Sequence, residues 1–278
     1  MSTVTSASKV TSADGTSIGY DKTGSGPPLV LVDGAFCSRT FGPMPDLTPL
    51  LATSFTVYAY DRRGRGGSGD TKPYAPEREI EDVEALIDAA GGSAYVYGIS
   101  SGAVLALRAA AALPGKVTKL AIYEAPMLVD DSRPAPPADY LQQINDMLAR
   151  GRNGDTVAFF MTKMVGTPAF VPYLIRVMPA WKKLTAAAPT LPYDLAILGD
   201  SQTGKGIPAE LAKAISSIDA PVWCGDGGKS PAWMHHAQDA AAALLSDSRR
   251  ETLAGQTHQV KPAVIAPALT AFFDEGEN

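Results

Sequence analysis

Short apolar runs alternate with longer helical patterns along most of the chain, and this alternation restricts the fold more than any other feature. Five runs rich in β-branched and aromatic residues predict strands at about 29–32, 55–60, 94–97, 120–123 and 221–224. Helical patterns lie at about 76–91, 101–113, 207–218, 231–246 and 261–274. Because parallel strands need long crossover connections, we expect an α/β fold with a mostly parallel central sheet and flanking helices.

The alternation stops between about Pro126 and Gly199. This stretch has Pro-rich turns and helical segments, many Met and aromatic residues, and no convincing strand. Apolar helices of this kind need a surface to cover, which favours a helical cap over a functional site. An ordinary second core is the alternative. The predicted organisation is therefore a core formed by residues 1–125 and 200–278, with a cap at 126–199.

The composition narrows the class of protein and its partners. Hydrophobic residues make up 45% of the 278 residues and the net charge is −5, so one sizeable core is expected and neither nucleic acid nor a membrane is an expected partner. No apolar run reaches the roughly 18 residues needed to span a bilayer, and residues 1–14 lack a signal-peptide pattern, which predicts a cytoplasmic protein. Cys37 and Cys224 are expected to be buried apolar residues.

Gly98-Ile99-Ser100-Ser101-Gly102 fits the pattern G-x-S-x-G between a predicted strand and an Ala-rich helix. In that setting the central serine lies on a tight, strained turn, and a side chain at either glycine would clash. Ser100 is therefore the predicted nucleophile. Ser101 is the competing hydroxyl, but its backbone N–H is better suited to stabilise an oxyanion at the start of the helix.

The general base follows from the scarcity of histidine. His258 lies in a loop before the C-terminal helical pattern, whereas His235 and His236 lie earlier, on a helical pattern, and are expected at the surface. A late loop can bring an imidazole back to the serine, in the chain order Ser, acid, His. No His or Cys spacing indicates a metal site.

With these motifs the chain resembles the α/β-hydrolase superfamily over nearly its whole length. The resemblance includes Asp33-Gly34-Ala35 after the first core strand and Asp61-Arg62-Arg63-Gly64-Arg65-Gly66 after the next. It implies an α/β-hydrolase fold in which the loop at Gly34 and Ala35 supplies the second oxyanion donor. Asp33 stands where most relatives have His, and we expect it to hold that loop through backbone hydrogen bonds.

The position of the catalytic acid departs from the common family pattern. Gly227-Gly228-Lys229-Ser230-Pro231 has Ser230 where the carboxylate usually stands, and a hydroxyl cannot stabilise an imidazolium as a carboxylate does. Glu124 follows the strand at 120–123, where some members of the superfamily carry their acid, and a carboxylate there is also costly to bury unless it is paired. The resemblance therefore makes Glu124 the preferred acid. Haloalkane dehalogenases and zearalenone lactone hydrolases are similar in this respect. The alternatives are Asp226, Asp130 and Asp131.

The resemblance to zearalenone-type lactone hydrolases extends to the Asp-Gly loop, the Ser-Ser-Gly turn and Pro179-Ala180-Trp181 in the cap. It implies that Trp181 contacts substrate, and Phe36 and Met161 are further candidates. Trp181, Met161 and Met164 could equally pack in the core of the cap.

These features predict a serine hydrolase that cleaves an ester or lactone of a hydrophobic small molecule through an acyl-enzyme, with no metal or organic cofactor. An acyltransferase or perhydrolase that uses the same triad is the alternative within enzymes. A ligand receptor of the same fold with slow turnover is the alternative from another class. A homo-oligomer is possible.

Overall fold

The computed structural model describes residues 5–275, with side chains from residue 8 onward. Residues 1–4 and 276–278 lie outside the described residues. The expectation that residues 1–14 contain no signal peptide therefore falls partly on residues that the structure does not describe. No helix within the described range is long and apolar enough to cross a membrane.

Eight strands of the described chain form one sheet in the order β1-β2-β4-β3-β5-β6-β7-β8. They are β1 (Thr5–Thr11), β2 (Ser17–Thr23), β3 (Pro28–Val32), β4 (Thr56–Tyr60), β5 (Ala94–Ile99), β6 (Val117–Tyr123), β7 (Val222–Gly227) and β8 (Ser248–Leu253). β1 and β2 pair in antiparallel fashion with their neighbours, and β3 to β8 are parallel. The mostly parallel sheet predicted from the sequence is therefore confirmed.

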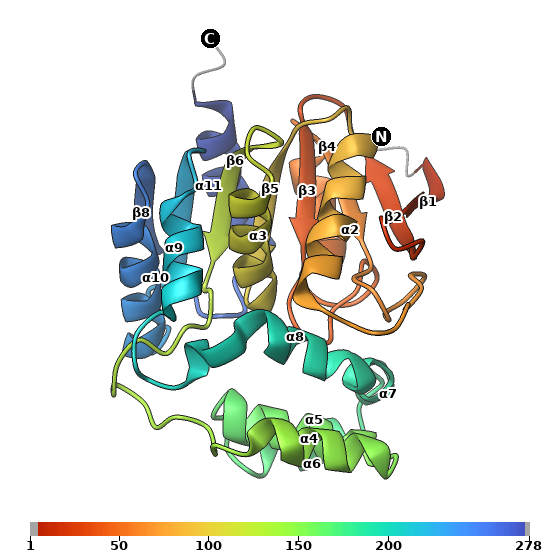
Figure 1. Ribbon diagram of the computed structural model, residues 1–278, viewed down its shortest axis with the longest axis vertical. Coiled ribbons are helices and arrows are strands. Elements are labelled where there is room, and N and C mark those ends of the chain that lie inside the picture. Colours follow the sequence, from red (N-terminus) through yellow and green to blue (C-terminus); the bar gives the residue numbers. More distant parts are fainter. Residues whose placement is uncertain (1–4, 276–278) are drawn as a thin grey trace.

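Helices cover both faces of this sheet (Figure 1). One face packs against α2 (Pro76–Ala89), α3 (Ser101–Ala112), α9 (Ala209–Ser216) and α10 (Ala232–Leu244). The other face packs against α1 (Met44–Leu51) and α11 (Pro262–Asp274). The two apolar layers explain why the inner strands read as continuous apolar runs, since a strand buried on both faces has no polar side.

Three strands and one helix were not predicted. β1, β2 and β8 lie at or near the edges of the sheet and carry mostly polar residues, as in SRRETL for β8. These strands are held in the sheet by backbone hydrogen bonds, and such bonds require no apolar pattern in the sequence. The helix α1 begins at Met44, just after Pro43, and contains Pro49, so its composition resembles that of a turn.

The segment between β6 and α9 contains helices and no strand among the described residues. These are α4 (Tyr140–Ala149), α5 (Asn153–Phe159), a π-helix η1 (Phe160–Met164), α6 (Val171–Ile175), α7 (Ala180–Ala187), η2 (Ala188–Thr190), α8 (Leu191–Leu198) and η3 (Gly199–Gln202). In Figure 1 they lie beyond the carboxyl ends of the inner strands, with α8 nearest the sheet. The division into core and cap stays a prediction, and α8 packs directly on α3.

Candidate active site

Ser100 lies between β5 and α3 in a backbone conformation that few residues adopt. Its φ is 59° and its ψ is −131°. A Cβ at Gly98 would lie 2.5 Å from the backbone oxygen of Gly102, and one at Gly102 would lie 2.4 Å from that of Val32. Both glycines of G-x-S-x-G are therefore sterically required, which allows the strained turn to expose the serine at the carboxyl edge of the sheet.

Glu124 follows β6, the strand next to β5, and is fully buried. Its Oε2 accepts a hydrogen bond from Nδ1 of His258 at 2.7 Å, across 134 residues of chain. This bond assigns the Nδ1–H tautomer and leaves Nε2 of His258 as the proton acceptor. Nε2 and the Ser100 hydroxyl make no hydrogen bond to any described residue, and both groups line one cavity.

The other oxygen of Glu124 has two donors. Oε1 accepts hydrogen bonds from the Gly227 amide at 2.8 Å and from the Ser230 hydroxyl at 2.5 Å. Ser230, which stands where the family pattern predicts a carboxylate, therefore holds the Glu124 side chain in position. Sequence reasoning treated Ser230 only as a missing carboxylate and overlooked this role.

Backbone strain is concentrated at this site. Among the described residues, only three that are not glycine have positive φ: Phe36 at 62°, Ser100 at 59° and Glu124 at 50°. Such conformations cost about 1–3 kcal/mol each and persist where the surrounding structure enforces them. All three residues lie in the loops that follow β3, β5 and β6, at the carboxyl edge of the sheet.

The alternative acids are paired elsewhere. Asp226 is buried and bonds to Arg250 and to Nδ1 of His235, the latter at 2.7 Å. Burial alone would raise the pKa of Asp226, but the hydrogen bond from Arg250 lowers it below its usual value. Asp130 bonds to Nδ1 of His236, and Asp131 has no hydrogen bond to His258 within the described part of the chain. The geometry therefore favours Glu124.

The two amides suited to stabilise an oxyanion are those of Ala35 and Ser101. Gly34 was an equal candidate, but its N–H donates to Oδ1 of Asp33 at 2.8 Å and is already used. Asp33 thus holds the loop through a backbone hydrogen bond, as expected from the sequence. No hydrogen bond from the Ala35 or Ser101 amide to another described residue is present, and both residues line the cavity with Ser100.

The cavity has a volume of about 180 Å³ and its walls are mostly apolar. Its large apolar side chains are Phe160, Met164, Val165, Leu198, Trp233 and Met234.

The substrate contacts predicted from the sequence do not line this cavity. Trp181 and Met161 are not among the described residues that line this cavity; both pack against the hydrophobic core. Phe36 reaches it indirectly, since its ring packs edge-on against Phe160 with centroids 5.2 Å apart. Trp233 and Met234 come from α10 and had no distinguishing sequence signal.

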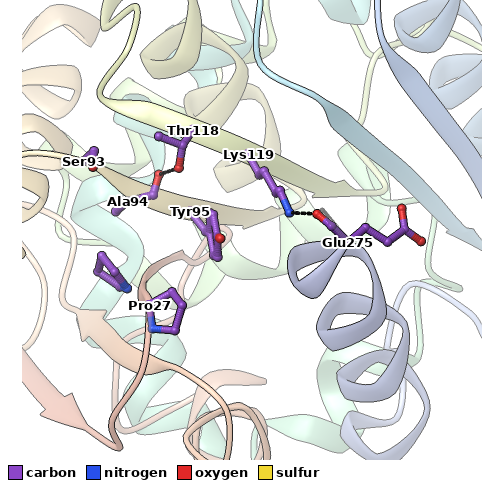
Figure 2. A pocket seen from close by; sticks show the side chains of 8 residues that line it. Pro27, Ser93, Ala94, Tyr95, Thr118, Lys119 and Glu275 are labelled. Carbon is purple, nitrogen blue, oxygen red and sulfur yellow. Dashed lines mark hydrogen bonds between the residues drawn. The ribbon is translucent and has the colours of Figure 1, made fainter. Parts of the chain in front are cut away.

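A second cavity, of about 410 Å³, lies at the amino-terminal ends of β3, β5 and β6 and contains none of these groups (Figure 2). Figure 2 shows Lys119 pointing toward Glu275 at the end of α11. The Lys119 ammonium donates to the backbone oxygens of Phe273 at 2.6 Å and Glu275 at 2.5 Å. Lys119 therefore fastens α11 to β6. In the described part of the chain no cluster of three or more His, Cys, Asp or Glu residues could hold a metal ion.

The sequence matches the model of the α/β-hydrolase family over residues 27–268, and the chain therefore belongs to that family. It is similar to the crystal structure of an α/β hydrolase from Sphaerobacter thermophilus DSM 20745, with 48% identity, a TM-score of 0.88, and coverage of 96% of this chain and 100% of that chain.

More distant structures share the fold. An enol-lactonase from Burkholderia xenovorans LB400 has 19% identity and a TM-score of 0.70, covering 96% of this chain and 100% of that chain. An esterase from Rhodococcus sp. ECU1013 has 20% identity and a TM-score of 0.63, covering 98% and 99%. At these identities the likeness extends to the fold alone.

Proposed function

We propose that this protein is a serine hydrolase that cleaves a carboxylic ester or lactone of a small apolar molecule through an acyl-enzyme on Ser100. The observation that carries the proposal is the hydrogen bond of 2.7 Å between buried Glu124 and His258, in the cavity that Ser100 also lines. A carboxylate that orients an imidazole, which in turn acts as the base for a serine, forms a catalytic triad.

In the proposed reaction, Nε2 of His258 removes the Ser100 proton as Oγ attacks the carbonyl carbon. Glu124 keeps the imidazole oriented and stabilises its positive charge. The Ala35 and Ser101 amides receive the oxyanion, and the loss of one such donor typically costs about 3–4 kcal/mol of barrier. His258 then protonates the leaving alcohol. In the second half of the reaction, His258 removes a proton from water as the water attacks the acyl carbon, and it returns that proton to Oγ of Ser100 as the carboxylic acid leaves.

The proposal is tested with an active-site-directed fluorophosphonate followed by peptide mass analysis. We expect a mass addition on the peptide that contains Ser100, and no addition in Ser100→Ala. Ser132→Ala, a change at an exposed serine, is the matched control and should label as the native protein does. A folded native protein that stays unlabelled would contradict the proposal. Product analysis with a competing alcohol or peroxide separates hydrolysis from acyl transfer and perhydrolysis.

The cavity supports a small substrate. Its volume of about 180 Å³ is below the roughly 300–1,000 Å³ typical of sites for drug-sized ligands. We therefore expect that p-nitrophenyl acetate and butyrate are hydrolysed with a kcat/KM at least about tenfold above that of the decanoate, since one methylene is worth up to about 1–3 kcal/mol in such a pocket. A kcat/KM that rises with chain length up to the decanoate would contradict the size argument, but it would leave the proposed triad unaffected.

A further inference from the structure

A buried ion cluster lies directly behind the oxyanion amides and has no part in the reaction described above. It consists of Arg62, Arg65, Glu79 and Asp194, whose side chains are at most 2% exposed. Arg62 binds both oxygens of Glu79, at 2.6 and 2.8 Å, and one oxygen of Asp194 at 2.6 Å. Arg65 binds the other oxygen of Asp194 at 2.5 Å.

Asp194 holds the residue that carries one oxyanion donor. Besides the two guanidinium groups, its Oδ1 accepts a hydrogen bond from the Ser101 hydroxyl at 2.8 Å. Ser101 is the first residue of α3, and its backbone N–H is one of the two free amides beside Ser100. The side chain of Ser101 therefore ties this amide to the ion cluster.

Arg65 holds the peptide that carries the other donor. Its Nη1 donates to the backbone oxygen of Gly34 at 2.7 Å. The Gly34 oxygen and the Ala35 N–H belong to the same planar peptide group and point in opposite directions in the trans form. An Arg65 guanidinium behind the carbonyl therefore aims the Ala35 N–H toward the cavity. Arg62 supports the same loop with a longer contact of 3.3 Å to the Asp33 oxygen.

Asp194 and one further contact come from the segment between β6 and α9. Asp194 belongs to α8, and Thr190, just before α8, accepts a hydrogen bond from Nε of Arg65 at 2.9 Å. The same helix is fastened to the rest of the protein by Tyr193, whose ring stacks on Tyr74 with centroids 3.8 Å apart. A residue of the predicted cap thus connects the two halves of the oxyanion site.

We infer that Asp194 is a positioning residue that sets the spacing of the Ala35 and Ser101 amides through Arg65 and the Ser101 hydroxyl. This inference rests on the proposed function. Glu79 and Asp194 balance the charges of Arg62 and Arg65, so the intact cluster is electrically neutral beside the developing oxyanion. Replacing Asp194 by Asn removes a negative charge from the wall of the cavity.

The sign of the effect separates positioning from charge. If only the charge of Asp194 acted on the oxyanion, Asp194→Asn would strengthen the binding of a tetrahedral, negatively charged adduct. If Asp194 positions the amides, the same change weakens it, because misplacement of a donor by about 1 Å can cost about 100-fold. A purely structural role would lower thermal stability and leave the preference for the adduct unchanged.

The test compares a trifluoromethyl ketone, which Ser100 converts into a tetrahedral hemiketal, with the corresponding methyl ketone. The inhibition constant of the methyl ketone divided by that of the trifluoromethyl ketone measures stabilisation of the oxyanion apart from ordinary binding. We expect the ratio to fall about 10- to 100-fold in Asp194→Asn and in Ser101→Ala. Asp155→Asn, which removes an exposed carboxylate paired with Arg152 and Arg176, should keep the native ratio.

Ser101→Ala keeps the experiment decisive if Asp194→Asn does not fold, because it removes only a hydroxyl and retains the amide. An unchanged or increased ratio in the folded variants overturns the inference while the native preference for the trifluoromethyl ketone leaves the proposed function intact. A native protein without that preference, and without fluorophosphonate labelling at Ser100, overturns both.

Discussion

At the scale of single residues, the proposed catalytic acid, Glu124, lies on a different strand from the one that the common family pattern predicts. Glu124 directly follows β6, and Ser230 lies in the loop after β7, where the family resemblance predicts a carboxylate. The exchange preserves a buried carboxylate next to His258 because the Ser230 hydroxyl and the Gly227 amide both donate to Glu124. A buried carboxylate without such donors would be costly.

This exchange predicts different outcomes for the two candidate acids. Glu124→Gln should lower kcat by about 10³-fold or more, because the amide cannot stabilise an imidazolium and favours the wrong tautomer. Asp226→Asn should retain kcat within a few-fold of the native value but lower the melting temperature, since Arg250 and His235 lose their buried carboxylate partner. Steady-state kinetics and thermal unfolding of both variants check this. An inactive but folded Asp226→Asn would transfer the role of acid to Asp226.

At the scale of elements, the contact between α3 and β3 constrains the site. Gly102 lies in the first turn of α3, where alanine would ordinarily favour the helix by about 1 kcal/mol. Here a Cβ would meet the backbone oxygens of Val32 at 2.4 Å and Asp33 at 2.5 Å. Because both oxygens belong to the backbone at the end of β3, either α3 or the loop that begins at Asp33 would have to move.

We therefore expect Gly102→Ala to reverse the usual propensity and destabilise the protein by about 1–3 kcal/mol, with a loss of kcat from the displaced loop. Gly154→Ala in α5 is the matched control. Its Cβ would meet only the Trp181 side chain, at 3.2 Å, and its stability should stay within about 1 kcal/mol of the native protein. Chemical denaturation measures both changes; equal stability of the two variants would contradict the steric argument.

At the scale of the whole molecule, a buried carboxyl makes the free energy of unfolding depend on pH. Asp33 is buried at the end of β3, and burial raises the pKa of its carboxyl to about 7, although the Gly34 amide and Arg65 act in the opposite direction. An ordinary aspartate titrates near 3.9. Between about pH 4 and pH 7, therefore, Asp33 carries a proton in the folded protein and has lost it in the unfolded chain.

Because the folded state binds more protons in that window, stability should fall as the pH rises from about 4 to about 7. Asp33→Asn removes this loss and can retain the acceptor for the Gly34 amide. We expect the variant to gain up to about 4 kcal/mol of unfolding free energy relative to the native protein at pH 8, and little at pH 4. Asp46→Asn, an exposed carboxylate, should show no such difference. A gain for Asp33→Asn that is equal at both pH values would contradict the assignment.

The sequence alone determined the parts of this protein that depend on local patterns. The inner strands, the helices after them, the strand–turn–helix setting of Ser100 and the late position of His258 follow from periodicity, glycine spacing and chain order. These features are readable because each arises from neighbouring residues. The same reasoning failed for the polar strands β1, β2 and β8, which lie at or next to the edges of the sheet and whose backbone pairing leaves no apolar signal.

Only the tertiary structure decided which groups meet. Glu124 and His258 are 134 residues apart, and Ser101 and Asp194 are 93 apart. Local patterns favoured Glu124 over Asp226, but they could not show its contact with His258 or the contact of Asp194 with Ser101. The structure likewise replaced Trp181 and Met161 by Phe160, Trp233 and Met234 as cavity walls. Such pairings depend on how the strands pack with the helices between β6 and α9, and packing is a property of the folded chain.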